Sequence, residues 1–128
     1  MPLVRVDIIE GRTEAEITAL SDTIQEVMVE FFAAPPLDKY QLFHEHRPGL
    51  IRALDTGLGY PRTDKIVVIH ITQQGRTTAQ KQAMYKAMSE RLAALGTAPT
   101  DLIISVSENT PADWSFGMGQ AQFLTGEL

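Results

Sequence analysis

The order of apolar and polar positions divides this chain into two similar halves. A strand-like apolar run at residues 3–9 is followed by Gly11-Arg12-Thr13, and a second run at 66–71 is followed by Gly75-Arg76-Thr77. After each motif come a helical pattern, the triplet Pro-x-Asp and another strand-like run. Such self-similarity predicts a duplicated supersecondary unit, here strand, helix, strand.

The predicted helices begin at well-marked positions. Thr13 and Thr77 each precede a Glu or Gln by three residues, which is the capping-box pattern. Behind each box, apolar residues recur every three or four positions, as expected of a helix with one buried face. We expect helices over about residues 13–33 and 77–95, the second ended by Gly96.

These elements predict an α+β fold in a single domain spanning residues 1–128. Two pseudo-symmetric β-α-β units, about residues 2–64 and 65–128, would form one four-stranded mixed sheet with both helices on one face. The run at 66–71 is almost continuously apolar, which is typical of a strand covered on both faces. The second sheet face would have no helix to cover it, so we expect a homo-oligomer.

Two segments lie outside the repeat. Residues 46–61 are rich in turn residues and predict a loop with a short hairpin. The tail from residue 109 to 128 carries Trp114, Phe116 and Phe123 among glycines. These aromatic side chains need a surface to bury against, on a neighbouring subunit or in a ligand pocket.

Composition and charge exclude several classes of function. The chain has 128 residues, a net charge of −5 and no cysteine. An acidic chain without a Lys/Arg block disfavours nucleic acid as a partner, and the lack of cysteine excludes disulfides and thiolate chemistry. With no long apolar stretch and no signal-peptide pattern, the expected location is cytoplasmic, away from membranes.

Pro2 is the residue with the most distinctive chemistry. Methionine aminopeptidases remove Met1 before a small residue, so we expect the mature chain to begin with a proline amine. A terminal proline is a secondary amine that can act as base, acid or covalent nucleophile toward a carbonyl. Many chains begin with Met-Pro without using this group, so the signal depends on its surroundings.

Arg76 and Asp38 are the candidate partners of this amine. If the halves pair antiparallel, the turn before the second helix lies beside Pro2, and Arg76 becomes a carboxylate anchor at a helix N-terminus. Alternatively Arg76 only solvates the helix start. A carboxylate at Asp38 would keep the amine protonated, or Asp38 stabilises a turn, as its counterpart Asp101 in the other half suggests.

Metal and cofactor sites are not predicted. His44 and His46 lie on one strand face, but no third ligand accompanies them, and zinc needs three or four. The glycines of residues 55–59 lack the strand-before, helix-after context of a phosphate-binding loop.

Taken together, these motifs resemble the tautomerase superfamily and, within it, the malonate semialdehyde decarboxylase family. The similarity covers essentially the whole chain. It rests on Pro2, Glu10–Thr13, Asp38–Gln41, His46–Gly49, Asp55–Tyr60, the turn at Gln74–Arg76, Glu108–Asn109, Asp113–Gly117 and Phe123–Gly126.

The resemblance implies a duplicated β-α-β fold assembled as a homotrimer, with the proline amine at the floor of each pocket and no cofactor. It implies loss of carbon dioxide from malonate semialdehyde (3-oxopropanoate), giving acetaldehyde, within bacterial haloalkene degradation. In that family Asp38 would assist a cationic Pro2. Two arginines in the second turn would bind the carboxylate, and Trp114, Phe116 and Phe123 would form an aromatic wall favouring its loss.

The second turn departs from this pattern. It reads Gln74-Gly75-Arg76, so Arg76 matches one arginine and Gln74 replaces the other. A neutral donor makes a weaker contact than a charged one, although Arg12 is a candidate to compensate. Alternative functions are tautomerisation of 2-oxo acids, hydration or dehalogenation of 3-chloroacrylate-like acids, or a cytokine-like trimer without enzyme activity.

Overall fold

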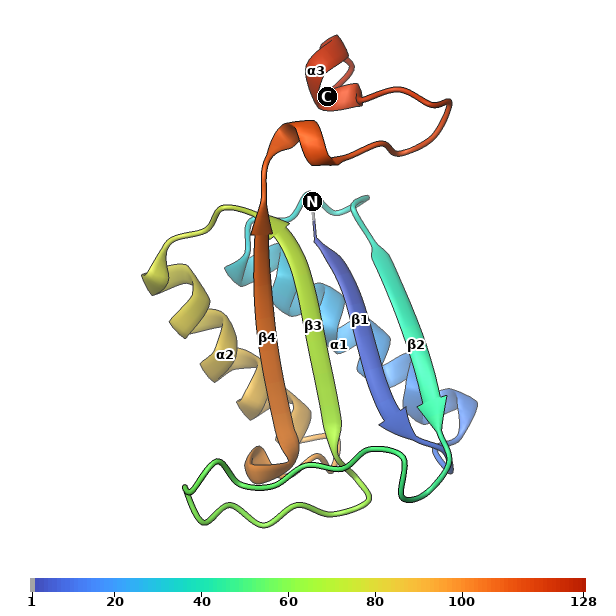
Figure 1. Ribbon diagram of the computed structural model, residues 1–128, viewed down its shortest axis with the longest axis vertical. Helices are drawn as coiled ribbons and strands as arrows, with labels where there is room; N and C mark the ends of the chain where they lie inside the picture. The colour runs from blue at the N-terminus through green and yellow to red at the C-terminus, as the bar shows by residue number, and fades with distance from the viewer. Residues whose placement is uncertain (1) are drawn as a thin grey trace.

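The computed structural model describes residues 2–128 and confirms the α+β fold. Two strand–helix–strand units follow one another along the chain, with short helical turns in the second half (Figure 1). The elements are β1 (Leu3–Ile9), α1 (Glu14–Phe31), β2 (Tyr40–His46), β3 (Val67–Gln74), α2 (Thr78–Ala93), η1 (Pro99–Asp101), β4 (Leu102–Asn109), η2 (Pro111–Asp113) and α3 (Gln122–Thr125).

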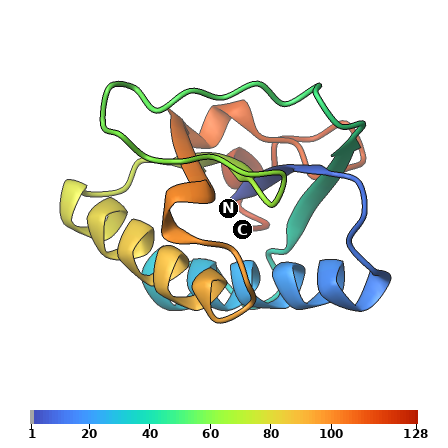
Figure 2. The ribbon, with the colours of Figure 1, turned by 90° about the horizontal axis from the view of Figure 1, so that it is seen from below.

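The sheet confirms the duplicated architecture. Its strand order is β2-β1-β3-β4, with β1 parallel to β2 and β3 parallel to β4. The two halves meet where β1 and β3 pair antiparallel, with Leu3 opposite Thr72 and Ile8 opposite Val67. Both long helices cover the same face of the sheet (Figure 2).

Each helix begins at the predicted capping box. In α1, Thr13 Oγ1 accepts from the Glu16 N–H at 3.2 Å, and Glu16 Oε1 accepts from the Thr13 N–H at 3.0 Å. Thr77 and Gln80 repeat this pair of bonds at 3.1 and 2.9 Å in α2. A cap of this kind contributes about 1 kcal/mol to stability. The start of each helix is therefore stabilised by residues that are close together in the sequence.

The ends of the helices are slightly earlier than predicted. The first helix ends at Phe31, and Ala33 adopts a left-handed conformation with φ of 52°. The second ends at Ala93, and Gly96, with φ of 94°, follows in the turn that reverses the chain. Glycine at that position avoids the steric cost of a side chain at positive φ.

The core lies between the sheet and the two helices. Alternate residues of the central strands point toward the helices and are fully buried, among them Val6, Ile8, Ile69 and Ile71. The helical residues of the same buried cluster are Leu20, Ile24, Val27, Met28, Met84, Ala87, Met88 and Leu92. Burying each such side chain stabilises the fold by roughly 1.5–3 kcal/mol.

The opposite face of the sheet has no helix over it. Alternation along β3 leaves Val68 half-buried and His70 exposed, so the prediction of a strand covered on both faces is wrong for the single chain. Apolar side chains from all four strands share this helix-free face: Leu3, Tyr40, Leu42, Val68 and Ile103. We refer to these residues as the open face.

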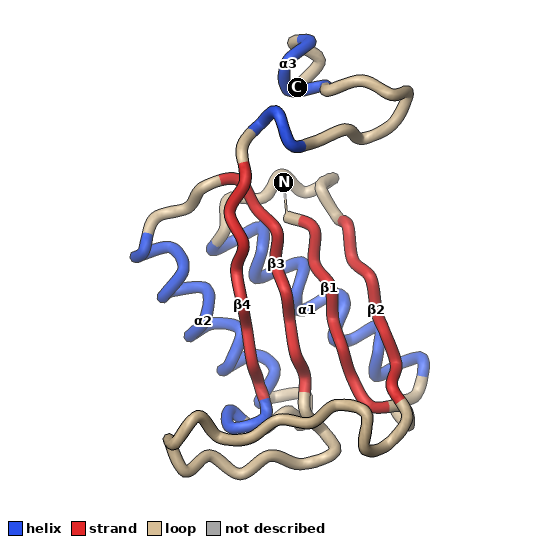
Figure 3. Tube along the Cα trace, in the orientation of Figure 1, coloured by secondary structure: helices blue, strands red, loops and turns tan. Residues whose placement is uncertain are grey.

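The connection between β2 and β3 corrects another prediction. Residues 47–66, all described by the structure, form a loop with turns and contain no hairpin strand. This loop lies at the end of the sheet opposite the C-terminal tail (Figure 3). Within residues 2–128, no helix is long and apolar enough to cross a membrane.

Candidate active site

Pro2 lies where the strand register converges on one end of the sheet. Leu3 pairs with Tyr40 on β2 and with Thr72 on β3. Pro2, one residue earlier, therefore lies beside the entry to β2 and the exit from β3. The antiparallel pairing needed to bring the second turn near the N-terminus is thus present. Pro2 itself is buried.

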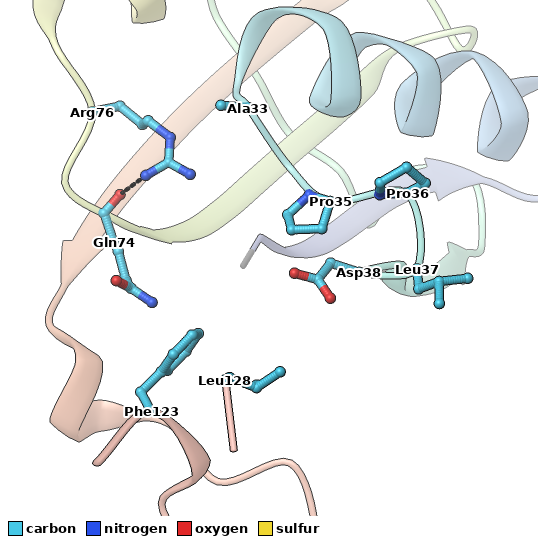
Figure 4. Close-up of a pocket in the computed structure, with 9 residues that line it drawn as sticks. All are labelled: Ala33, Pro35, Pro36, Leu37, Asp38, Gln74, Arg76, Phe123 and Leu128. Carbon is cyan, nitrogen blue, oxygen red and sulfur yellow. Dashed lines mark hydrogen bonds between the residues drawn. The ribbon is translucent and has the colours of Figure 1, made fainter. Parts of the chain in front are cut away.

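At this end of the sheet a cavity of about 590 Å³ opens between the second turn, the α1–β2 connection and the tail (Figure 4). Four of the predicted site residues line it, namely Asp38, Gln74, Arg76 and Phe123. The other described residues on its wall are Ala33, Pro35, Pro36, Leu37 and Leu128. Pro2, Trp114 and Phe116 are not among the described lining residues.

Arg76 extends from the turn between β3 and α2 toward the end of α1. Its Nε donates to the Phe32 carbonyl at 2.8 Å, and Nη1 donates to the carbonyls of Gln74 at 3.2 Å and Gly75 at 3.1 Å. The guanidinium carbon also lies 5.8 Å from the centre of the Phe32 ring. These contacts fix a cation at the cavity wall.

Burial lowers the pKa of Arg76, because a partly desolvated cation is less favourable than a hydrated one. An arginine still carries its charge at neutral pH after such a shift. Arg76 therefore supplies the cavity with a positive charge whose position is set by backbone carbonyls. That arrangement suits an incoming carboxylate.

Asp38 differs from its sequence counterpart Asp101 in what its carboxylate does. Both oxygens of Asp101 accept hydrogen bonds from Thr63, one of them from the backbone N–H at 2.7 Å. Asp38 Oδ2 is buried, and no hydrogen-bond partner for it exists among the described residues. The turn at Asp38 is instead made by its backbone N–H, which donates to the Pro35 carbonyl at 2.9 Å.

A buried carboxylate oxygen without a donor is costly and needs an explanation. In Figure 4 the carboxylate of Asp38 points into the cavity, on the side facing Gln74 and Phe123. The turn-stabilising interpretation drawn from Asp101 therefore does not describe the side chain of Asp38. A ligand or a protonated amine would supply the missing donor.

The aromatic residues of the tail form one stack that supports the cavity wall. Trp114 and Phe116 stack with ring centres 5.4 Å apart, and Phe116 stacks on Tyr40 at 5.6 Å. Phe116 also meets the edge of Phe123 at 5.5 Å, and Phe123 lines the cavity. Trp114 and Phe116 thus lie behind the wall and hold Phe123 in place.

Two further sequence predictions have structural outcomes. Arg12 follows β1 at the opposite end of the sheet and donates to the Lys65 carbonyl at 2.8 Å, so within the single chain it does not compensate for Gln74. The apolar residues Pro35, Pro36, Leu37 and Leu128 were not predicted as wall residues. The one signal in the sequence for Pro35, Pro36 and Leu37 as wall residues is that they directly precede Asp38.

The other candidate sites are occupied by internal contacts. Asp55 accepts hydrogen bonds from Gly57 N at 3.0 Å and Gly59 N at 2.8 Å, and these bonds lower the pKa of its carboxyl. The N–H groups that a phosphate would need therefore already hold a carboxylate. Within residues 2–128, no three His, Cys, Asp or Glu side chains form a group that could hold a metal ion.

Comparisons with known proteins agree with the fold. Two family profiles, both described as tautomerase enzyme, match residues 2–59 and 38–117. Probable tautomerase YrdN of Bacillus subtilis (strain 168) is 48% identical over 100% of both chains.

Solved structures also agree with the fold of this chain. A crystal structure of malonate semialdehyde decarboxylase is 42% identical, covers 98% of each chain and superimposes with a TM-score of 0.95. The symmetric trimer of fused 4-OT is 23% identical, covers 97% of this chain and 98% of its own, and has a TM-score of 0.78. The second likeness concerns the fold alone.

Proposed function

The chain belongs to the tautomerase superfamily, and we propose that it is a cofactor-independent decarboxylase that converts 3-oxopropanoate to acetaldehyde and carbon dioxide. Pro2 is the proposed catalytic amine, exposed once Met1 is removed. The similarity to malonate semialdehyde decarboxylase supports this reaction. The observation that carries it is the cavity where Asp38 Oδ2 lacks a donor on a wall shared with Arg76.

In the proposed reaction, Arg76 holds the substrate carboxylate. The bond between the carboxylate carbon and the methylene carbon breaks, and its electron pair moves toward the aldehyde carbonyl. A proton then adds to the methylene carbon and acetaldehyde leaves. Holding the carboxylate so that the breaking bond stands perpendicular to the carbonyl plane is the contribution of the anchor.

Pro2 can assist this step in two ways. A protonated amine donates a hydrogen bond to the carbonyl oxygen and stabilises its developing negative charge. Alternatively, a neutral amine attacks the carbonyl carbon, and the adduct loses water to form an iminium. After decarboxylation, hydrolysis of the iminium releases acetaldehyde and restores the amine. Asp38 favours the protonated amine in the first case and moves protons in the second. Reduction with borohydride in the presence of substrate separates them, because only the iminium leaves a covalent adduct.

The decisive experiment is a substrate panel followed by proton magnetic resonance. Protein with Met1 removed, as verified by intact mass, is incubated separately with 3-oxopropanoate, phenylpyruvate enol and 3-chloroacrylate. We expect acetaldehyde from the first at a rate that the Pro2→Ala variant does not reach. No acetaldehyde above the Pro2→Ala control would overturn the decarboxylase assignment.

A second candidate is tautomerisation of a 2-oxo acid at the same cavity. It is favoured by the neutral Gln74 and by a cavity that lies within the range of about 300–1,000 Å³ that holds drug-sized ligands. The same panel tests this alternative, because rapid ketonisation of phenylpyruvate enol without acetaldehyde from 3-oxopropanoate would select it.

We further propose that the chain assembles as a homotrimer through its open face. Tyr40 and Leu42 on this face are 40% and 51% exposed in the single chain, which is unfavourable for large apolar side chains. The fused 4-OT of the same fold is a symmetric trimer. Light scattering coupled to size exclusion should give three times the chain mass, and a monomer would contradict the proposal.

A further inference from the structure

The wall of the cavity contains few charges and much apolar surface. Among the side chains of the described residues that line it, Arg76 is the one cation and Asp38 the one anion, with Gln74 as a neutral amide. The remaining wall is formed by Ala33, Pro35, Pro36, Leu37, Phe123 and Leu128. These side chains present no polar group to a ligand.

Gln74 lies on the same turn as Arg76, at the last position of β3, where it pairs with Asn109 on β4. Its backbone carbonyl accepts from Arg76 Nη1, so that contact does not involve the side-chain amide. Figure 4 shows this amide projecting into the cavity, between Arg76 and Phe123. An amide can donate to a carbonyl or hydroxyl oxygen but cannot neutralise a second carboxylate.

The charge of a ligand is restricted by these residues. A monocarboxylate places one negative charge against Arg76 and leaves Gln74 to a neutral polar group. A dicarboxylate places a second negative charge in a partly dry space that already holds Asp38, whose charge would be balanced by a protonated Pro2, and no second cationic side chain lines the described wall. Like charges in such surroundings repel strongly.

The size of a ligand is restricted as well. A three-carbon oxo acid has no side chain with which to reach the six apolar wall residues. A cavity of about 590 Å³ lined in this way gains most of its binding free energy from apolar groups removed from water. The wall therefore favours an acid with a longer apolar body.

We infer that Gln74 determines charge specificity, so that the site binds monocarboxylates in preference to dicarboxylates and binds a monocarboxylate more tightly as its apolar body becomes longer than three carbons. The inference rests on the proposed function in that it concerns the same site. Unlike the proposed reaction, it concerns ligand recognition, and binding can be measured without turnover.

The test measures binding of non-reacting acids to the full chain, in its own assembly and with Met1 removed, by calorimetry or by shifts in magnetic resonance. Propanoate, butanoate and hexanoate should bind about fourfold more tightly per added methylene, the ratio given by ~0.8 kcal/mol per buried CH₂. In adipate a second carboxylate replaces the terminal methyl group of hexanoate. Adipate should bind at least tenfold more weakly than hexanoate.

Two variants assign these preferences to residues. Gln74→Arg should reduce the difference in affinity between hexanoate and adipate to less than threefold. Gln82→Arg adds the same charge on the exposed surface of α2 and should leave this difference in affinity unchanged. Phe123→Ala should flatten the dependence on chain length. It tests the apolar wall independently if Gln74→Arg does not fold.

Three outcomes would overturn the inference: adipate binding as tightly as hexanoate, affinity independent of chain length, or equal ratios in Gln74→Arg and Gln82→Arg. Acetaldehyde formation from 3-oxopropanoate is scored separately. Lack of that activity with the binding preferences intact refutes the proposed decarboxylation but not the inference.

Discussion

The indole Nε1 of Trp114 donates a 2.8 Å hydrogen bond to Oδ1 of Asn109, the last residue of β4. Trp114 also stacks on Phe116, which stacks in turn on Tyr40 at the start of β2. The tail is therefore held at both edges of the sheet, above the end where Pro2 lies. This explains how a glycine-rich segment can provide a defined wall for the cavity.

Replacing Asn109 with alanine should release the tail while leaving the sheet folded. A lost hydrogen bond of about 1 kcal/mol makes detachment of the tail roughly fivefold more frequent. We expect faster proteolysis within residues 114–128 and an increased KM, with the melting temperature nearly unchanged. Asn109→Asp keeps an acceptor for the indole and serves as the control, so equal proteolysis of the two variants would contradict this role.

The repeat explains why so much of the fold was predictable. Thr13 and Thr77 use the same capping box, and Arg12 and Arg76 before them each donate to a backbone carbonyl of the other half. The capping boxes are readable from the sequence because residues three apart form their contacts. The antiparallel meeting of the halves then follows from placing two similar units about a twofold axis.

The site was less predictable because it depends on what breaks the repeat. Asp38 and Asp101 occupy equivalent Pro-x-Asp positions, yet only Asp101 has Thr63 as a partner. The tail covers one end of the sheet and the loop of residues 47–66 lies at the other. These are contacts between segments far apart in sequence, and no local pattern specifies them.

The equivalent aspartates should respond oppositely to loss of charge. Asp38→Asn removes a charge from a carboxylate whose Oδ2 is buried and lacks a donor among the described residues, so stability should be unchanged or higher. Asp101→Asn turns an amide N–H toward one of the two donors of Thr63 and should cost about 2 kcal/mol. Urea unfolding measures both changes.

Activity provides the second half of this comparison. Asp38→Asn should lower kcat at least 100-fold, the usual lower bound for removing a group that handles protons. Asp101 lies far from the cavity, so the Asp101→Asn variant should retain its kcat at temperatures below the melting temperature of the variant. A stable and fully active Asp38→Asn variant would show that the carboxylate has no part in turnover.

Replacing Pro2 with alanine should leave the fold intact and remove most turnover. Alanine supplies a primary amine at the same strand end, but not the secondary amine on which the proposed chemistry depends. We expect kcat/KM to fall at least 100-fold with an unchanged circular dichroism spectrum. Protein that retains Met1, separated and identified by intact mass, should be equally inactive; activity in that species would exclude a role for the amine.

Arg76→Lys should separate charge from geometry. Lysine keeps the positive charge but cannot reproduce the planar fork that reaches the carbonyls of Phe32, Gln74 and Gly75. We expect a KM at least tenfold higher, equivalent to ~1.4 kcal/mol, and a loss of about 2 kcal/mol of stability.

The matched control for Arg76→Lys is Arg91→Lys. Arg91 lies on the surface of α2, pairs with Glu30 at 2.6 Å and stacks over Phe31 at 5.3 Å. Exposed pairs contribute little, so this substitution should cost less than 1 kcal/mol and leave KM unchanged. Similar losses of stability in both variants would indicate that the backbone contacts of Arg76 have no special weight.

Acid should destabilise the protein through carboxylates held by hydrogen bonds. Burial alone would raise the pKa of Asp7, but hydrogen bonds from His46 at 2.6 Å and from Arg5 together lower it. Backbone N–H groups likewise lower the pKa of Asp55 and, at the start of α1, of Glu16. In each case the folded state favours the charged form.

Because these pKa values are lower in the folded than in the unfolded chain, the stability they confer is fully present above the unfolded value of about 4. It is lost as the pH falls through the folded values. In urea unfolding, these carboxylates should therefore contribute a constant amount to the free energy of unfolding between pH 5.5 and pH 7, and a decreasing amount below pH 4. Asp7→Asn should be less stable at pH 7 and should decline less steeply in acid, whereas parallel curves for the variant and the parent would show that Asp7 does not contribute.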